Sequence, residues 1–289
     1  MPDIVRIRDA VFAGTQSLLT ILKMPFFWRP PSTINPQGDK DLVILGNGPS
    51  LSDFIVNQRQ FLADKETLAV NMFVQSDFFE QIRPQYYVVS SPEMWLDDVL
   101  PEYKSWRRDF FNALTLKTQW DMDFFIPVGA RRKKFWQKIL ANNPHIKIRF
   151  YNTLPVEGYR WFRHLLYNRH IGIPRPHNVL IPSLMLSIWM GKRKIYLAGA
   201  DHNWMKELFV ADDNTVYLTQ KHFYDARTAR PDTMKKLGKG QRKMHEILEK
   251  WYYAFRSYHD IRDYAETKGI RIINITPDSF IDAFERKKL

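Results

Sequence analysis

Short runs of hydrophobic residues alternate with longer segments of helical periodicity from residue 40 onward. The pattern predicts strands at 42–45, 68–70, 86–90, 147–150, 194–197 and 270–274, and helices at 135–141, 182–190 and within 240–268. Strands that alternate with helices indicate a mainly parallel sheet with helices on both of its faces. The predicted fold class is therefore α/β, a doubly wound Rossmann-type sheet in a single domain.

The first thirty residues carry a different pattern, in which apolar side chains recur at helical spacing. No continuous apolar run approaches the roughly 20 residues that a membrane-spanning helix needs. A signal peptide is not indicated, because Asp3 and Asp9 flank the arginines and no small-residue cleavage site follows. The recurring apolar positions are Ile4, Ile7, Val11, Leu18 and Leu22, with Arg6, Arg8 and Lys23 between them.

Pro25 is expected to break this helix and to leave the aromatic cluster 26–28 beside Arg29. Two arrangements fit the pattern: a helix lying in a membrane interface, or a helix packed against the body of its own protein. Positive charge beside an interfacial segment favours the cytoplasmic leaflet. We therefore expect residues 1–30 to contact an anionic membrane surface, with the protein peripheral on the inner face of the cytoplasmic membrane.

Residues 30–38 are rich in proline and small polar residues, which is typical of a linker. The chain thus divides into an N-terminal segment with its linker at 1–34 and an α/β catalytic domain at 35–289, whose globular part begins near Asp39. Residues 209–239 show no regular periodicity and are rich in cationic and aromatic side chains. Long irregular stretches in compact domains are usually functional, so we expect a lid near 205–240.

The composition narrows the classes of function. The 289 residues carry a net charge of +12 and no cysteine, which excludes disulfides, cysteine-ligated zinc and thiol catalysis. A basic balance suits nucleic acid, an anionic membrane or phosphate-rich small molecules. Nucleic acid is the least favoured of these, because the basic clusters are scattered and no nucleic-acid-binding signature is present.

The sequence Gly46-Asn47-Gly48-Pro49-Ser50 follows the first predicted strand directly. Its glycines permit positive φ angles and a close approach of backbone N–H groups to a phosphate or nucleotide, and Ser50 is a suitable N-cap for the next helix. The loop is neither a Walker A motif nor a full dinucleotide fingerprint. Nucleotide binding and a purely structural turn both remain open.

Polar residues follow other predicted strands as well, and ligands of open α/β sheets bind at these carboxyl ends. Asn71 and Ser91 are candidates, although single residues of these types also form turns. Asp201 and His202 could bind a metal, act as an acid–base pair or hold a loop. A metal site is not indicated, because no second ligand cluster accompanies them, and the pair Asp121 and Asp123 is a weak signal for one.

The lid segment contains the candidate general base His222. The aromatic and cationic side chains around it could stabilise a phosphate leaving group. These side chains are Tyr217, Tyr224, Arg227 and Arg230.

Taken together, these islands resemble bacterial sialyltransferases of lipo-oligosaccharide synthesis. The matching segments are 42–51 (LVILGNGPSL), Asn71, Ser91-Pro92, 195–201 (IYLAGAD) and 276–284 (TPDSFIDAF). The resemblance implies a glycosyltransferase-A-like fold, no metal, a CMP-activated sugar, a histidine base and two lid tyrosines at the leaving phosphate. It places Gly46, Asn47, Gly48 and Ser50 around the nucleotide, Asn71 on the donor, and Ser279 near a phosphate. We expect Pro49 and Ser91 to belong to the same binding site.

Some positions depart from that family. Ser91 replaces an asparagine, and the sequence at 178–180 (NVL) replaces the Thr-Ser-Gly that grips a sialic acid carboxylate. The base could be His222, His245 or His259. The Gly-x-Gly-Pro-Ser-Leu start also resembles a broader group that includes 6-hydroxymethylpterin diphosphokinase-like and flagellin-glycosylating proteins.

The sequence therefore predicts an inverting, metal-independent glycosyltransferase that moves a sugar from a CMP-activated donor to a surface glycan or glycolipid. In this hypothesis His222 is the base, Tyr217 and Tyr224 act on the leaving phosphate, and Asp201 belongs to the site. One alternative is ATP- and Mg²⁺-dependent diphosphoryl transfer, with Asp201 and the pair 212–213 as metal ligands. The other is a non-catalytic scaffold for glycan assembly.

Overall fold

The computed structural model describes residues 2–36, 38, 40–224, 229–236 and 240–289. Within this part of the chain, an eight-stranded sheet has the order β10-β9-β6-β1-β2-β3-β4-β5, and all of its pairings are parallel. Its strands are β1 (Leu42–Leu45), β2 (Glu66–Val70), β3 (Tyr86–Val88), β4 (Met122–Pro127), β5 (Ile146–Tyr151), β6 (Lys194–Ala198), β9 (Arg271–Asn274) and β10 (Glu285–Arg286).

The strand order reverses beside β1. Strands β1 to β5 follow one another outward in one direction, whereas β6, β9 and β10 extend the sheet from the other side of β1. The loops that leave neighbouring strands at such a reversal diverge and open a crevice at the carboxyl edge of the sheet. This topology confirms the predicted doubly wound, mainly parallel sheet.

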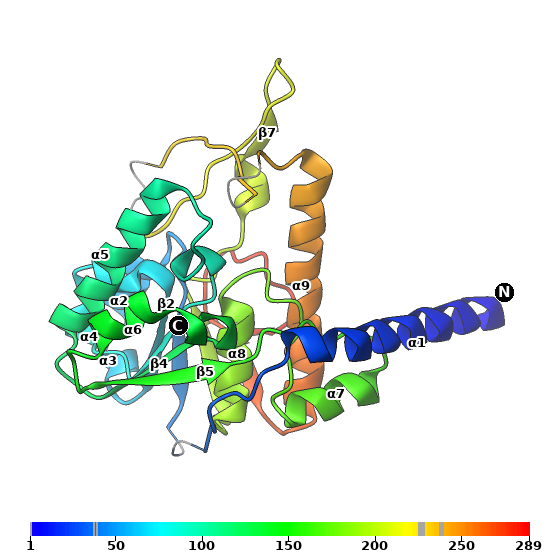
Figure 1. Cartoon of the computed structure of the whole chain (residues 1–289), viewed down its shortest axis with the longest axis horizontal. Coiled ribbons are helices and arrows are strands. Elements are labelled where there is room, and N and C mark those ends of the chain that lie inside the picture. The colour runs from blue at the N-terminus through cyan, green and yellow to red at the C-terminus, as the bar shows by residue number, and fades with distance from the viewer. Residues whose placement is uncertain (1, 37, 39, 225–228, 237–239) are drawn as a thin grey trace.

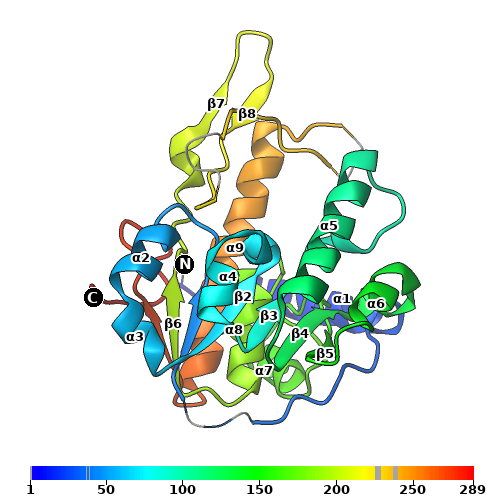
Figure 2. The ribbon, with the colours of Figure 1, turned by 90° about the vertical axis from the view of Figure 1, so that its left-hand side faces the viewer.

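Helices cover both faces of the sheet (Figures 1 and 2). One hydrophobic core packs helices α2, α3, α4, α5 and α6 against one face of the sheet. A second core packs α7, α8 and α9 against the other face. The helices are α1 (Pro2–Phe27), α2 (Leu51–Asn57), α3 (Arg59–Ala63), α4 (Phe78–Ile82), α5 (Pro101–Lys117), α6 (Lys134–Leu140), α7 (Arg160–Asn168), α8 (Leu180–Trp189) and α9 (Met244–Glu266). The 3-10 helices are η1 (Asn71–Gln75), η2 (Pro92–Met94), η3 (Val128–Arg132) and η4 (Trp204–Glu207).

The central elements are apolar on every side because both of their faces are covered. All residues of β1 are fully buried, as expected for a parallel strand between two layers of helices. Every residue of α8 is also buried, because this helix contacts the sheet and α9. A continuous hydrophobic run therefore marks both a central strand and a central helix here.

The sequence pattern missed strand β4, whose first residues include Asp123. The Asp123 carboxylate bonds to Arg149 at 3.1 Å, and the Asp121 carboxylate bonds to Lys147 at 2.7 Å. The Asp121–Asp123 pair thus serves ion pairs at the amino end of β4. The stretch 209–239 is not wholly irregular, because β7 (Leu208–Val210) and β8 (Val216–Leu218) form an antiparallel hairpin.

Helix α1 projects from the body of the protein (Figure 1). It continues to Phe27, so the prediction that Pro25 breaks it is wrong. Pro25 lies in the last turn, where the missing N–H costs one hydrogen bond, and Trp28 N still donates to Met24 O at 2.9 Å. By length and composition, Ile4–Phe27 with its mean hydropathy of 1.2 could cross a membrane, which corrects the expectation that no such stretch exists.

The segment after α1 is tied to the edge of the sheet. Asn152, beyond β5, donates its side-chain amide to Arg29 O at 2.8 Å. Ser32 N donates to Phe150 O at 2.8 Å, and Ser32 Oγ accepts from Phe150 N at the same distance. The predicted linker is therefore fixed to β5 at these points.

Candidate functional site

A cavity of about 820 Å³ opens at the carboxyl ends of β1, β2, β3 and β6, at the reversal of strand order. The loops after these strands and the segment after β8 line it, so residues far apart in the sequence meet there. Of the predicted site residues it gathers Asn47, Gly48, Pro49, Asn71, Ser91, Asp201, His222 and Tyr224. This volume lies within the roughly 300–1,000 Å³ range of ligand pockets.

The two glycines of the β1 loop allow close packing against the loop after β6. Neither has a positive φ, so the conformational role predicted for them is wrong. A Cβ on Gly46 would lie 2.4 Å from Gly199 O, and one on Gly48 would lie 1.9 Å from Asp201 Oδ2. Only glycine fits at these positions because the neighbouring backbone and carboxylate occupy the space of a side chain.

Asp201 holds the β1 loop in place. Ser50 Oγ donates to Asp201 Oδ2 at 2.9 Å, and Ser50 N donates to Asp201 Oδ1 at 3.3 Å. Ser50 therefore does not cap α2 with its side chain, contrary to the prediction. Burial raises the pKa of the Asp201 carboxyl, and the hydrogen bonds from Ser50 oppose that rise.

Asn47 lines the cavity and carries a buried acceptor without a partner among the described residues. Its side-chain Nδ2 donates to Val70 O at 3.1 Å, which fixes the orientation of the amide. Its Oδ1 is buried and has no hydrogen-bond partner among the described residues. A buried acceptor without a partner is costly, so a ligand N–H group that reaches it would gain a hydrogen bond. Asn71, next to Val70, lines the same cavity with a φ of 46°.

His222 and Tyr224 project from a segment that is anchored to the body. Phe223 N donates to Asn47 O at 3.1 Å, and the Phe223 ring packs 5.7 Å from that of Phe73. The rings of His222 and Tyr224 lie parallel with centroids 5.0 Å apart, and both residues line the cavity. The partly buried Phe223 between them in sequence thus positions both side chains.

The other histidines proposed as the base lie elsewhere. His245 is exposed in the first turn of α9, and His259 Nε2 lies 3.1 Å from Asp282 Oδ1. Neither residue lines the cavity. Among the three candidates, His222 has the position that a base acting in this cavity requires.

A buried hydrogen-bond network that the sequence did not predict forms the floor of the cavity. His202 Nε2 lies 2.6 Å from Tyr258 Oη, which donates to Asn178 Oδ1 at 3.1 Å. That oxygen also accepts from Leu180 N at 2.9 Å, and Asn178 Nδ2 is left without a partner among the described residues. Asn178 therefore offers a fixed donor at the cavity wall.

His202 makes stability dependent on pH. Burial lowers the pKa of its imidazole to about 3, whereas the unfolded chain titrates near 6.5. The unfolded state binds the extra proton below pH 6.5, so stability present at neutral pH is lost as the pH falls toward 3. Between pH 7.5 and 5 we expect this group to cost about 2 kcal/mol. Urea unfolding at both pH values tests this: H202Q should lose about 2 kcal/mol of the pH dependence that the control H245Q retains, while His177 still contributes its own share, and equal dependence in both variants would contradict it.

Cationic side chains dominate the charged part of the cavity wall. Lys206, Lys221, Lys235, Arg242 and Lys250 line it, against the carboxylates of Glu93, Asp201 and Glu207. Arg242 Nε is buried without a partner among the described residues. Burial and the nearby Arg242 lower the pKa of Lys250, and burial with Lys250 and Arg175 lowers that of His177 to about 4. The cationic character of 209–239 was expected from the sequence, but that Lys206, Arg242 and Lys250 join it at one cavity is known only from the structure.

Several predicted residues do not reach the cavity. Tyr217 stacks on Phe209 in the hairpin, with ring centroids 5.5 Å apart. Ser279 is buried, where its Oγ donates to Ala200 O at 2.6 Å and accepts from Asn274 at 2.9 Å. Gly46 and Ser50 of the β1 loop do not line the cavity, nor does the exposed Arg230, and Arg227 falls outside the described residues.

No group of three or more potential metal ligands gathers among the described residues. Asp213 of the predicted pair 212–213 accepts from Thr215 N at 2.9 Å in the exposed turn of the hairpin, and Asp201 is bonded to Ser50. The carboxylates proposed for Mg²⁺ binding are therefore engaged in separate places.

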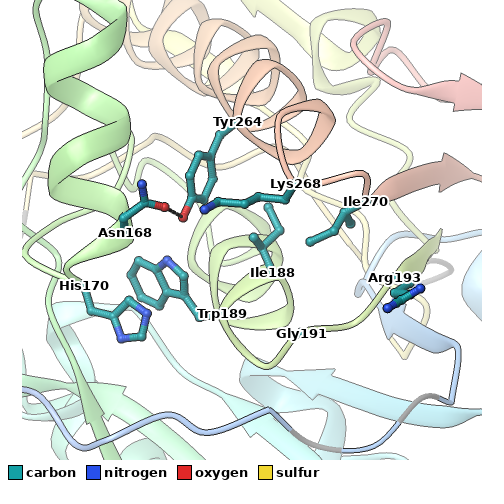
Figure 3. Close-up of a pocket in the computed structure, with 9 residues that line it drawn as sticks. All are labelled: Asn168, His170, Ile188, Trp189, Gly191, Arg193, Tyr264, Lys268 and Ile270. Atoms are coloured by element: carbon teal, nitrogen blue, oxygen red, sulfur yellow. Dashed lines mark hydrogen bonds between the residues drawn. The ribbon is translucent and has the colours of Figure 1, made fainter.

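A second cavity, of about 320 Å³, lies near the amino ends of β6 and β9, at the opposite edge of the sheet (Figure 3). Its wall contains His170 over Trp189, with ring centroids 4.4 Å apart, and Tyr264 Oη, which donates to Asn168 Oδ1 at 2.9 Å. None of the predicted site residues lines it, so the larger cavity is the candidate site.

Comparisons with known proteins do not identify the function of this chain. No family model matches the chain, and no curated protein matches it in sequence. A solved structure with a similar fold is the MAf glycosyltransferase from Magnetospirillum magneticum AMB-1, with a TM-score of 0.49 and 8% identity. The match covers 94% of this chain and 38% of that chain, so the present chain spans well under half of that protein. A match this distant does not transfer an activity.

Proposed function

We propose that this protein is a glycosyltransferase that moves a sugar from a CMP-activated donor to the hydroxyl of a glycan acceptor. The observation that carries the proposal is that the β1 loop, Asn71, His222 and Tyr224 line one cavity at the reversal of strand order. The resemblance to bacterial sialyltransferases implies donor contacts for the β1 loop and Asn71, together with a histidine base and lid tyrosines, roles for which His222 and Tyr224 are the candidates. The cavity is large enough for a nucleotide with its sugar.

Asn47 supports cytosine as the base of the donor. Its Oδ1 is a buried acceptor whose orientation is fixed by the bond from Nδ2 to Val70 O. The exocyclic amino group of cytosine is a donor, whereas uracil has a carbonyl oxygen at that position. A fixed acceptor therefore favours CMP over UMP, because two acceptors would face each other with uracil bound.

The cations of the wall support an anionic donor. A CMP-sugar carries a phosphate, and a sialic acid or another keto-sugar acid adds a carboxylate. Lys206, Arg242 and Lys250 supply positive charge inside the cavity, where limited solvent strengthens electrostatic interactions. Asn178 Nδ2 adds a neutral donor to the same wall. From the sequence, Arg227 and Arg230 were the arginines expected to stabilise the phosphate. In this proposal the cations of the cavity wall have that role.

The proposed reaction is a direct displacement. The acceptor hydroxyl oxygen forms a bond to the anomeric carbon as the bond from that carbon to the phosphate oxygen of CMP breaks. His222 takes the hydroxyl proton, and CMP leaves with the electron pair of the broken bond. Tyr224 and the cationic wall stabilise the charge that develops on the leaving phosphate. One displacement inverts the configuration at the anomeric carbon.

Hydrolysis of CMP-N-acetylneuraminic acid without an acceptor tests this function. We expect slow release of CMP, unchanged by EDTA, because water replaces the acceptor in the same cavity. A diphosphokinase would instead consume ATP and lose all activity with EDTA, and a scaffold would release nothing. If the protein hydrolyses no CMP-sugar acid, the proposal is overturned. EDTA-sensitive consumption of ATP would then indicate a diphosphokinase, and no activity at all would indicate a scaffold.

Lys250 provides a test of the cationic wall. The K250M substitution removes one buried positive charge, so the dissociation constant for CMP should rise about tenfold or more, since a hydrogen bond to a charged group contributes about 1.5–3 kcal/mol. K268M is the matched control, because Lys268 lines the cavity at the opposite edge of the sheet. Isothermal titration calorimetry measures both variants, and unchanged affinity in K250M would remove this wall from the phosphate site.

A further inference from the structure

Helix α1 contacts the body through a stripe of small and hydroxyl-bearing residues. Ser17 and Thr20 are buried, Tyr159 N donates to Ser17 Oγ at 3.0 Å, and Glu157 N donates to Thr20 Oγ1 at 3.1 Å. Tyr159 Oη donates to Ala10 O at 2.7 Å. The loop approaches closely at Gly158, where an added Cβ would lie 2.0 Å from Ser17 Oγ. Residues 10, 17 and 20 lie on one face of a helix, so this face is turned inward.

The large apolar side chains of α1 occupy the opposite face and are exposed. Val11 is 64% exposed, Leu22 57% and Phe26 74%. A helix that packs on its own protein buries its apolar stripe and exposes its polar one, whereas α1 does the reverse. Other exposed apolar residues of the helix are Ile4, Ile7, Phe12, Leu18 and Leu19. A continuous exposed apolar surface of this kind marks a site of contact with a membrane or with another protein.

Charge and aromatic residues favour a lipid membrane as the partner. Arg6 lies near the start of the helix and Arg29 just beyond its end, and both are exposed. Trp28 follows Phe26 and is exposed, and the exposed Trp161 of α7 stacks on Tyr159 with ring centroids 6.5 Å apart. Arginine and tryptophan beside an apolar helix face are typical of a helix at an anionic membrane surface.

The contacts of α1 also decide between spanning and lying on a membrane. The stretch Ile4–Phe27 is long and apolar enough to cross a bilayer by length and composition. The hydrogen bonds of Ala10, Ser17 and Thr20 hold the middle of the helix against residues 157–159, so in this structure it cannot be surrounded by lipid. We propose that α1 lies in the plane of an anionic membrane surface and inserts only its outward face.

Glu157 connects helix α1 with the wall of the candidate site. Arg175 Nη2 donates to Glu157 Oε2 at 2.7 Å, and Glu157 also bonds to α1 through Thr20. Pro176 and His177, directly after Arg175, line the larger cavity. The membrane contact and the cavity are therefore linked by one ion pair. The membrane inference itself does not depend on the identity of the donor.

Vesicle flotation with the full chain tests the membrane contact. The protein should float with phosphatidylcholine vesicles that contain phosphatidylglycerol, and about tenfold less with phosphatidylcholine alone. The double variant L18D/L22D should lose at least tenfold in binding, because each leucine contributes about 1.5–3 kcal/mol on burial. L116D is the matched control, since Leu116 is 74% exposed on α5. Equal binding of both variants would overturn the proposal.

Probe depth distinguishes the arrangements. The chain has no cysteine, so V11C, L18C and F26C each provide one labelling position for an environment-sensitive fluorophore. Quenchers at known depths should place all three probes near the headgroup region. A probe at Leu18 near the bilayer centre with the others closer to its surfaces would show a spanning helix. Failure to bind vesicles, with dimers by sedimentation that L18D/L22D dissociates, would show that a second copy covers this face instead.

Discussion

H222A is expected to lower the turnover of the full chain with a CMP-sugar acid and an acceptor by about 10²–10⁴-fold, the range for loss of a general base. The reason is geometric: among the three candidate histidines, His222 lines the cavity, next to the anchored Phe223 in sequence and parallel to the ring of Tyr224. The dissociation constant for CMP should change little, because the imidazole acts on the acceptor hydroxyl. Steady-state kinetics and calorimetry separate these two effects.

H245A and H259A are the matched controls for this prediction. His245 is exposed on α9, and His259 lies beside Asp282, so each substitution removes an imidazole from outside the cavity. Both variants should keep near-normal turnover. If H222A keeps it instead, His222 is not the base, whichever donor the enzyme uses.

G48A is expected to disable the site by displacing the β1 loop. The new methyl group would lie 1.9 Å from Asp201 Oδ2 and 2.7 Å from Gly199 O. The loop must then move, which breaks the bond from Gly48 N to Gly199 O and weakens the contact between Ser50 and Asp201. We expect a loss of about 2 kcal/mol or more in the free energy of unfolding and loss of CMP binding.

G129A is the control, because the atom nearest to an added Cβ there is Trp95 Nε1 at 3.8 Å. Urea unfolding measures the loss of stability, and calorimetry measures binding. Normal stability and affinity in G48A would show that the packing between the loops after β1 and β6 does not shape the nucleotide site.

The fold was predictable from the sequence where elements are buried on both faces. The run 42–45 matches β1, and the expected strand at 194–197 differs from β6 by one residue, because continuous hydrophobic runs mark central parallel strands. Strand β4 was missed because Asp123 interrupts its pattern, and its partner Arg149 is known only from the structure. The helix break at Pro25 failed because a proline in the last turn removes only one bond.

The candidate site was predictable where residues directly follow strands. Asn47, Asn71 and Asp201 could be found because parallel strands deliver their following loops to a common edge. Tyr258 and Lys250 could not, because they come from α9, whose packing depends on long-range contacts. The network from His202 through Tyr258 to Asn178 left no pattern in the sequence. The outward apolar face of α1 was visible as a stripe, but its orientation required the contacts of Ser17 and Thr20.

The most direct test of the central claim is calorimetric titration of the full chain with CMP, UMP, GMP and AMP under identical conditions. The cavity should bind CMP most tightly: Asn47 Oδ1 is an acceptor that disfavours the carbonyl oxygen of uracil, the cationic wall attracts the phosphate, and the preference over purine nucleotides rests on the resemblance to sialyltransferases. N47D keeps the size of this side chain but cannot donate to Val70 O, and it places a negative charge near the phosphate, so it should weaken CMP binding. Binding of all four nucleotides with equal affinity, or of none of them, would contradict the assignment of a CMP-activated donor.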